Sequence, residues 1–134
     1  MTTDTRTPVS AIGRDSARRG LVMLAAGSSA LMAVIYLLIG LRMVEVIQPA
    51  DEQPAFGLVA AAFFAGVAAV LIRWQRPIVW FLALANHMFV AYVYFDLASE
   101  RMPDFEAWGL GLRVLQVPAI LALGFLLFRS RHRG

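Results

Sequence analysis

The sequence of 134 residues is 60% hydrophobic and only 16% charged, and its net charge is +3. A soluble fold of this length would leave apolar surface unburied, so the composition excludes an ordinary soluble domain and favours one compact helical membrane domain. The absence of cysteine excludes disulfides, thiolate nucleophiles and iron–sulfur ligation by this chain. All twelve basic residues are arginines, and their distribution follows a topology signal rather than a nucleic-acid-binding patch, so no nucleic-acid partner is predicted.

Four apolar blocks are separated by three short polar stretches. A helix needs about 20 mainly apolar residues to cross roughly 30 Å of hydrocarbon. Each block meets or approaches this length, so the sequence predicts transmembrane helices over residues 20–47, 55–73, 77–98 and 107–128. Because the connections are short, consecutive helices are expected to be antiparallel neighbours. The predicted fold is therefore an all-α membrane protein, with four transmembrane helices in an antiparallel up-down bundle.

Two tails flank the predicted membrane domain of residues 20–128. Residues 1–19 contain Thr, Asp and Arg without hydrophobic periodicity and are predicted to form a mobile tail, and residues 129–134 form a short basic tail. Arginines are concentrated in both tails and in the middle connection, whereas the other two connections hold a single arginine, Arg101. By the positive-inside rule, both termini are predicted to be cytoplasmic in a multi-pass protein of the bacterial plasma membrane.

The pair Arg18 and Arg19 ahead of an apolar run also imitates a secretion signal, with small residues near Ala33 as a cleavage site. The apolar region of such a signal is about 7–15 residues long. Here the apolar run continues to Ile47, so we expect an uncleaved first span.

The second predicted span carries small residues at a spacing of four: Gly57, Ala61, Ala65 and Ala69. Such a ridge lets another helix backbone approach closely, and its partner could be another helix of this chain, a second copy or another membrane subunit. A GC-rich genome that uses alanine heavily explains the same pattern equally well.

Polar groups inside the predicted spans carry the most functional information, because each has an insertion cost and needs a partner or a water-filled cavity. Four ionisable residues from three spans are predicted at similar depth on the outer side: Arg42, Glu45, Asp96 and Arg113. They could form two pairs of opposite charge around an outward-facing cavity. The alternatives are that these residues only stabilise the packing of the helices, or that the two carboxylates lie at the level of the lipid headgroups.

His87, beside Asn86 near the middle of the third span, is the best single candidate for a functional site. It could be a hydrogen-bonded structural residue, a proton-transfer or ligand-binding residue, or a haem ligand at a subunit interface. The other histidine, His132, lies in the predicted cytoplasmic tail, which excludes bis-histidine ligation within one chain. A lone histidine with distant carboxylates also does not have the spacing of metal ligands. No metal and no cofactor are therefore predicted.

Aromatic residues near the ends of the predicted spans are typical of a headgroup belt. These residues are Trp74, Trp80, Tyr94 and Trp108.

The size, the four spans and the step Gly40-Leu41-Arg42 at the end of the first span resemble the small DoxX-like membrane proteins, in which a basic residue follows a glycine near that point. The usual Lys-Leu of that family is Arg42-Met43 here. The resemblance covers the hydropathy profile of nearly the whole chain but few residues. It implies a quinone-linked or redox-complex role, with a lipophilic or redox partner.

Two functions agree with these features. The first is a non-catalytic membrane subunit or a binder of a lipophilic small molecule, surrounded by the lipid bilayer. The second is a small membrane enzyme or proton-coupled carrier for a lipophilic substrate, with acid–base groups from His87, Glu45 or Asp96 and an arginine that holds an anionic or carbonyl group. The candidate ligand-binding residues are Arg42, Asn86, His87, Arg113 and Gln116. A cavity that joins His87 to the outer charges favours the second function, and a densely packed bundle favours the first.

Overall fold

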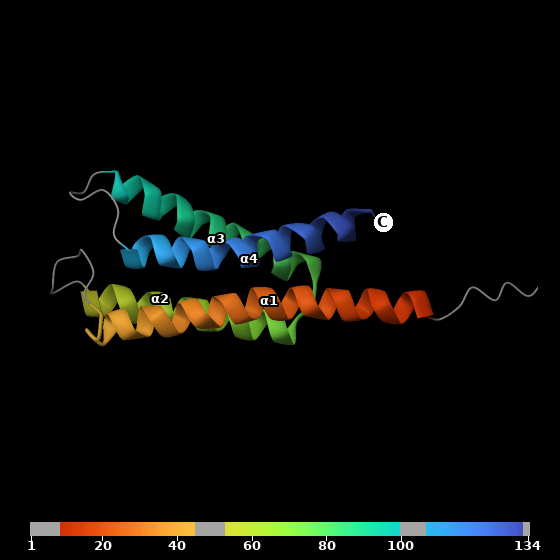
Figure 1. The fold of residues 1–134 in the computed structure, drawn as a ribbon, viewed down its shortest axis with the longest axis horizontal. Coiled ribbons are helices and arrows are strands. Elements are labelled where there is room, and N and C mark those ends of the chain that lie inside the picture. The colour runs from red at the N-terminus through yellow and green to blue at the C-terminus, as the bar shows by residue number, and fades with distance from the viewer. Residues whose placement is uncertain (1–8, 45–52, 100–106, 133–134) are drawn as a thin grey trace, which may run out of the picture.

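The computed structural model describes residues 9–44, 53–99 and 107–132 (Figure 1). Within these ranges the chain forms four α-helices: α1 (Val9–Gly40), α2 (Gln53–Arg73), α3 (Pro77–Ala98) and α4 (Ala107–Arg131). Each helix is long and apolar enough to cross a membrane. The predicted all-α class and the four span-length helices are therefore confirmed.

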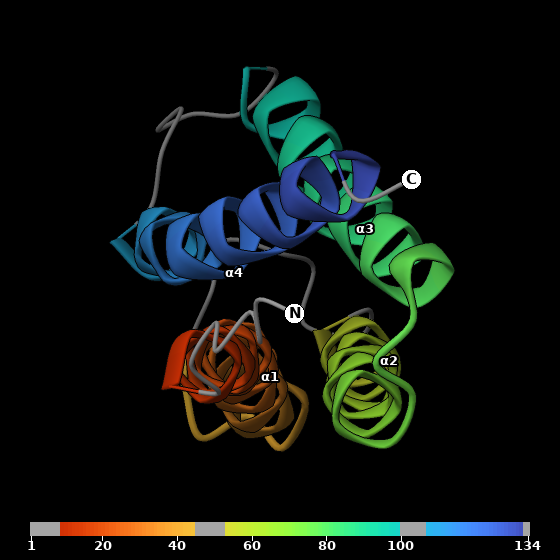
Figure 2. The same ribbon diagram turned by 90° about the vertical axis from the view of Figure 1, so that its right-hand side faces the viewer.

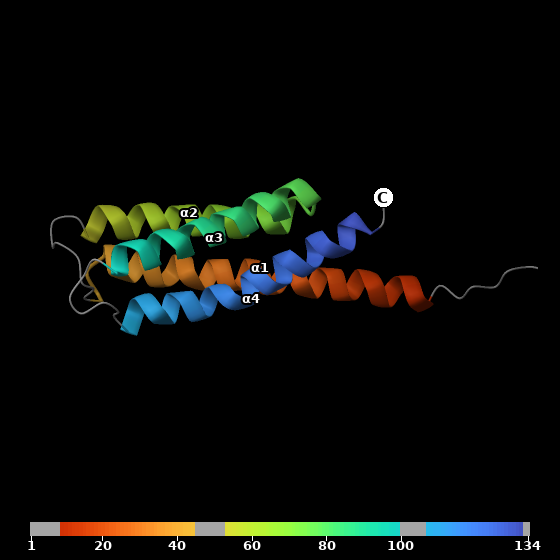
Figure 3. The same ribbon diagram turned by 90° about the horizontal axis from the view of Figure 1, so that it is seen from above.

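The helices lie side by side with alternating directions. Seen along the bundle, α1 and α2 form one layer, and α3 and α4 lie across it (Figure 2). The most extensive packing joins α1 to α2, and α4 packs on both α1 and α3, whereas the packing of α2 against α3 is the least extensive among the helix pairs that touch. In Figures 1 and 2, α3 starts beside the end of α2 and then leans away from it. The view from above shows that α1 extends well beyond the other helices at its N-terminal end (Figure 3).

The first helix begins at Val9, within the segment that the sequence assigns to an irregular tail. This segment holds several good helix formers, and extending an existing long helix costs much less than nucleating a new one. Arg18 also fixes this part of α1 to the turn between α2 and α3. Its guanidinium donates to the Gln75 carbonyl at 2.8 Å and lies 5.1 Å from the centre of the Trp80 ring.

The same helix ends at Gly40, earlier than the sequence predicts. The Arg42 backbone has a left-handed φ of 58°, and its N–H donates to the Ile39 carbonyl at 3.0 Å. The Met43 N–H donates to the Leu38 carbonyl at 2.9 Å. This pair of bonds is a Schellman motif, with arginine at the position that usually holds glycine. Arg42 therefore lies in an exposed turn after the helix and not inside the outer third of the span.

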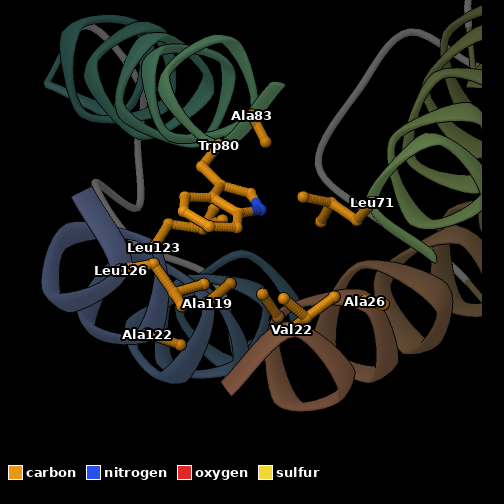
Figure 4. Packing of buried hydrophobic residues seen from close by; sticks show 10 residues of the cluster. Val22, Ala26, Leu71, Trp80, Ala83, Ala119, Ala122, Leu123 and Leu126 are labelled. Carbon is orange, nitrogen blue, oxygen red and sulfur yellow. The ribbon is translucent and has the colours of Figure 1, made fainter. Parts of the chain in front are cut away.

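Two clusters of buried side chains hold the helices together. One cluster lies toward the end of the bundle where α2 ends and α3 begins. Figure 4 shows the Trp80 indole directed into this cluster, with Leu123 and Leu126 of α4 on one side and Leu71 of α2 on the other. Trp80 is only 4% exposed, so it is a core residue and not part of a headgroup belt. The second cluster, which includes Met32, lies toward the opposite end.

The predicted ridge of small residues on α2 divides into two parts. Gly57 and Ala61 are buried, and a Cβ added at Gly57 would overlap the backbone of Gly40 on α1. Ala65 and Ala69 are exposed. Because an α-helix has 3.6 residues per turn, positions spaced by four drift around it, and only the first two meet α1. The close approach within this chain explains Gly57 without a second copy.

Candidate functional site

A cavity of about 520 Å³ lies among the four helices, at the end of the bundle where α1 and α3 end and α2 and α4 begin. We call it the lateral cavity, because Val59 and Phe63 of α2 and Phe89 of α3 line it and are each more than half exposed. The opening therefore lies between α2 and α3, which pack only loosely on one another.

The lining of the lateral cavity is apolar except at a few positions. The side chains that carry polar atoms are Tyr36, Asn86, Tyr94, Trp108 and Arg113. Among the described lining residues there is no carboxylate and no imidazole. A mainly apolar cavity with a few convergent polar groups is typical of a small-molecule site.

Arg113 is the one charged residue of the described lining, and it is only 8% exposed. Its Nη2 donates to the Tyr36 hydroxyl at 2.9 Å, and its guanidinium carbon lies 4.9 Å from the centre of the Tyr94 ring. Its Nε and Nη1 atoms have no hydrogen-bond acceptor among the residues that the structure describes. A cationic group is thus held by a neutral hydroxyl and an aromatic face, with two nitrogens unsatisfied.

Aromatic packing fixes the two tyrosines around this guanidinium. The Tyr36 ring stacks on Phe64, with ring centres 5.5 Å apart and planes 4° apart. It also meets the edge of Phe56 at 5.7 Å. Gly109 lies one turn before Arg113 on α4, and a Cβ added there would overlap the Tyr94 ring. Only a glycine at this position lets Tyr94 lie against α4 beside the guanidinium.

Asn86 supplies a second unsatisfied donor to the lateral cavity. It lies on α3 and is partly buried, and its Nδ2 atom is buried with no hydrogen-bond acceptor in the described part of the chain. Buried polar atoms normally have a partner, so an unsatisfied donor in a cavity wall marks a position where a ligand or a water molecule would bind.

His87 lies outside the cavity lining and joins three helices. It is fully buried, and its Nε2 atom lies 3.0 Å from Ser29 Oγ of α1. The Ser29 hydroxyl donates its single proton to the Ala25 carbonyl at 2.9 Å, so the imidazole Nε2–H is the donor in the contact with Ser29. Gln116 Nε2 of α4 then donates to His87 Nδ1 at 3.4 Å and to the His87 carbonyl at 3.2 Å.

This three-helix network assigns a neutral imidazole with its proton on Nε2. It gives the His87 ring a hydrogen-bonded structural position. The ring centre also lies 5.4 Å from that of Phe64, which lines the lateral cavity. Phe64 therefore contacts the network and also lines the cavity.

The structure brings together only some of the candidate site residues. Arg113 and Asn86 line the lateral cavity, and His87 and Gln116 lie next to it in the network. Asp96 is exposed on α3 and forms no ion pair with Arg113 within the described part of the chain. The exposed Arg42 is not a lining residue, and Glu45 lies outside the described residues.

Sequence reasoning missed Tyr36 and placed Tyr94 in the headgroup belt. A tyrosine near a span end is typical of the membrane interface, so neither residue by itself indicates a site. The one available hint for Tyr94 is Gly109, a small residue one helical turn from a buried arginine.

In the described residues, no three His, Asp or Glu side chains lie close enough together to hold a metal ion. No family model, curated protein or solved structure matches this chain. The resemblance to DoxX-like proteins stays a prediction of the sequence.

Proposed function

We propose that the chain is a small integral protein of the bacterial plasma membrane that binds a lipophilic small molecule in the lateral cavity. The observation that carries this proposal is the cavity itself. Its volume of about 520 Å³ falls within the range of roughly 300–1,000 Å³ for small-molecule sites. In a bilayer its opening between two apolar helices would face hydrocarbon, so an apolar ligand could enter from the membrane without crossing water.

The arrangement of the arginines supports an orientation with both termini in the cytoplasm. Arg14 and Arg18 of α1, Pro77 at the start of α3, and Arg129 near the end of α4 line one small pocket. Arginines of the first and the last helix thus meet at one end of the bundle, beside the connection that carries Arg73 and Arg76, as the positive-inside rule requires of a cytoplasmic side. The lateral cavity then lies in the outer half of the membrane.

Binding is favoured over catalysis for this cavity. The described lining offers no carboxylate or imidazole for acid–base chemistry, and both His87 ring nitrogens are engaged in the three-helix network. A general base must reach the reacting proton within hydrogen-bond distance, or through one water molecule. These groups do not meet that requirement, so the enzyme or carrier hypothesis has less support.

The test fills the cavity and compares what co-purifies. Ala60 lines the cavity on α2, whereas Ala62 on the same helix is exposed and outside the lining. The wild type, Ala60→Trp and Ala62→Trp are extracted with their native lipids, and the bound small molecules are identified by mass spectrometry. We expect a lipophilic species with the wild type and Ala62→Trp that is depleted from Ala60→Trp. If the three preparations retain the same species in the same amounts, the cavity is not a binding site.

A further inference from the structure

We infer, on the basis of the proposed function, that the ligand of the lateral cavity is a lipophilic monoanion whose charged oxygen atoms accept hydrogen bonds from Arg113. The inference names the chemical class of the ligand. It also gives a reason for a buried arginine that the described residues leave without a counter-ion.

The first step is the cost of the Arg113 charge. An arginine side chain cannot be deprotonated in a protein, so burial cannot be relieved by loss of the proton. An ionised group away from water needs both an opposite charge and hydrogen bonds, and breaking such a pair is strongly destabilising. The Tyr36 hydroxyl satisfies one guanidinium nitrogen and the Tyr94 ring contributes a cation–π contact, but Nε and Nη1 have no acceptor within the described ranges.

The second step is the source of the missing anion. Asp96 is the described carboxylate that the sequence offered for this role, and it is exposed and forms no ion pair with Arg113. The cavity that Arg113 lines is open to the side of the bundle. An anion that enters through this opening meets Arg113 in the wall of the cavity.

The third step is the nature of the anion. Arg113 contributes the one formal charge of the described lining, so a single negative charge matches it and a second would stay unpaired. Arg113 is six residues along α4 from Ala107, which places it about 9 Å below the start of the helix. A large polar headgroup at this depth would find few partners in an apolar wall. A compact carboxylate on an apolar body fits both the charge and the lining, and the unsatisfied Asn86 amide provides another donor.

The experiment uses Trp108, which lines the cavity, as a contact sensor. Bromine quenches tryptophan fluorescence on contact. The full chain in phosphatidylcholine nanodiscs is titrated with 9,10-dibromostearate or with its neutral methyl ester, each expressed as a mole fraction of the bilayer. The difference between the wild type and Trp108→Phe isolates the Trp108 signal from the signals of the other two tryptophans.

Hydrogen bonds to charged groups predict that the carboxylate quenches Trp108 at a concentration about ten- to a hundredfold lower than the ester. Arg113→Gln should remove this preference while the ester still quenches. Arg113→Lys, which keeps the charge but not the planar guanidinium, should retain part of it. Arg42→Gln changes an exposed arginine at the same end of the bundle outside the lining, and it should leave the preference unchanged.

The outcomes separate this inference from the proposed function. Equal quenching by the acid and the ester in the wild type overturns the inference that the ligand is an anion, but it leaves the proposed binding of a lipophilic molecule in place. Absence of Trp108 quenching by either probe overturns the proposed function. If Arg113→Gln does not fold, the preference for the acid over the ester is compared in the wild type, Arg113→Lys and Arg42→Gln. An undiminished preference in Arg113→Lys together with its loss in Arg42→Gln contradicts the role of Arg113.

Discussion

The three-helix network around His87 makes a quantitative prediction about stability. His87→Phe keeps a ring of similar size but removes both hydrogen bonds of the imidazole nitrogens, whereas His87→Ala also removes the ring from a fully buried site. The two substitutions therefore separate the hydrogen bonds from the packing. Met88→Ala is the matched control, because Met88 is the next residue on α3 and is 53% exposed.

The magnitudes follow from what each partner retains. Without the imidazole, Ser29 still donates to the Ala25 carbonyl, and Gln116 still donates to the backbone carbonyl of residue 87. Interhelical hydrogen bonds in membrane proteins contribute about 0.6 kcal/mol each on average, so His87→Phe should lower the free energy of unfolding by about 1 kcal/mol. Loss of a large buried side chain costs about a further 2–5 kcal/mol, so His87→Ala should lower the free energy of unfolding by about 3–6 kcal/mol in total.

The assay is reversible unfolding in mixed micelles by titration with sodium dodecyl sulfate, followed by far-UV circular dichroism. Comparing the double variant Ser29→Ala/His87→Phe with the two single variants gives the coupling free energy between α1 and α3. This energy should be near the value for one interhelical hydrogen bond. If His87→Ala is as stable as Met88→Ala, the network does not hold the helices together. If folded His87→Phe loses ligand quenching of Trp108, His87 belongs to the binding site and the structural assignment is wrong.

Two further predictions concern packing and topology. Gly57→Val should destabilise the bundle by at least about 2 kcal/mol, because the added side chain overlaps the α1 backbone. The control is Gly66→Val, which has open space around its Cβ and should stay close to the wild type in the same titration. Equal losses of stability in the two variants would show that α1 and α2 do not approach closely at Gly57. A cysteine that replaces Gln53 should react with an impermeant thiol reagent in intact cells, while one that replaces Thr3 should be protected, as expected for cytoplasmic termini. Labelling of the cysteine at position 3 would overturn the proposed orientation of the protein in the membrane.

The sequence predicts the spans well and their ends less well. Apolar blocks of about 20 residues reflect the thickness of the hydrocarbon, so four helices follow from composition alone. The early end of α1 depends on the left-handed backbone of Arg42, which only glycine normally signals. Its early start depends on contacts of Arg18 with Gln75 and Trp80, which are far away in the sequence.

The candidate site was predictable where the signal is a polar residue in an apolar span. Arg113, Asn86 and Gln116 are recognisable for this reason, and all three are near or in the lateral cavity. The positions of Tyr36 and Tyr94 were not predictable, because they depend on aromatic stacking and on a close helix approach that single-sequence spacing does not encode.

Phe64 packs between the tyrosine that holds Arg113 and the three-helix network of His87. Its ring stacks on Tyr36, which holds Arg113, and its ring centre lies 5.4 Å from that of His87. We expect a ligand that shifts Tyr36 to move the Phe64 ring as well, because a close-packed interior transmits such displacements. The magnetic environment of the His87 imidazole then changes although the ligand does not touch it. His87 is therefore a built-in NMR reporter of cavity occupancy, and isotope-labelled histidine would follow binding without any added probe.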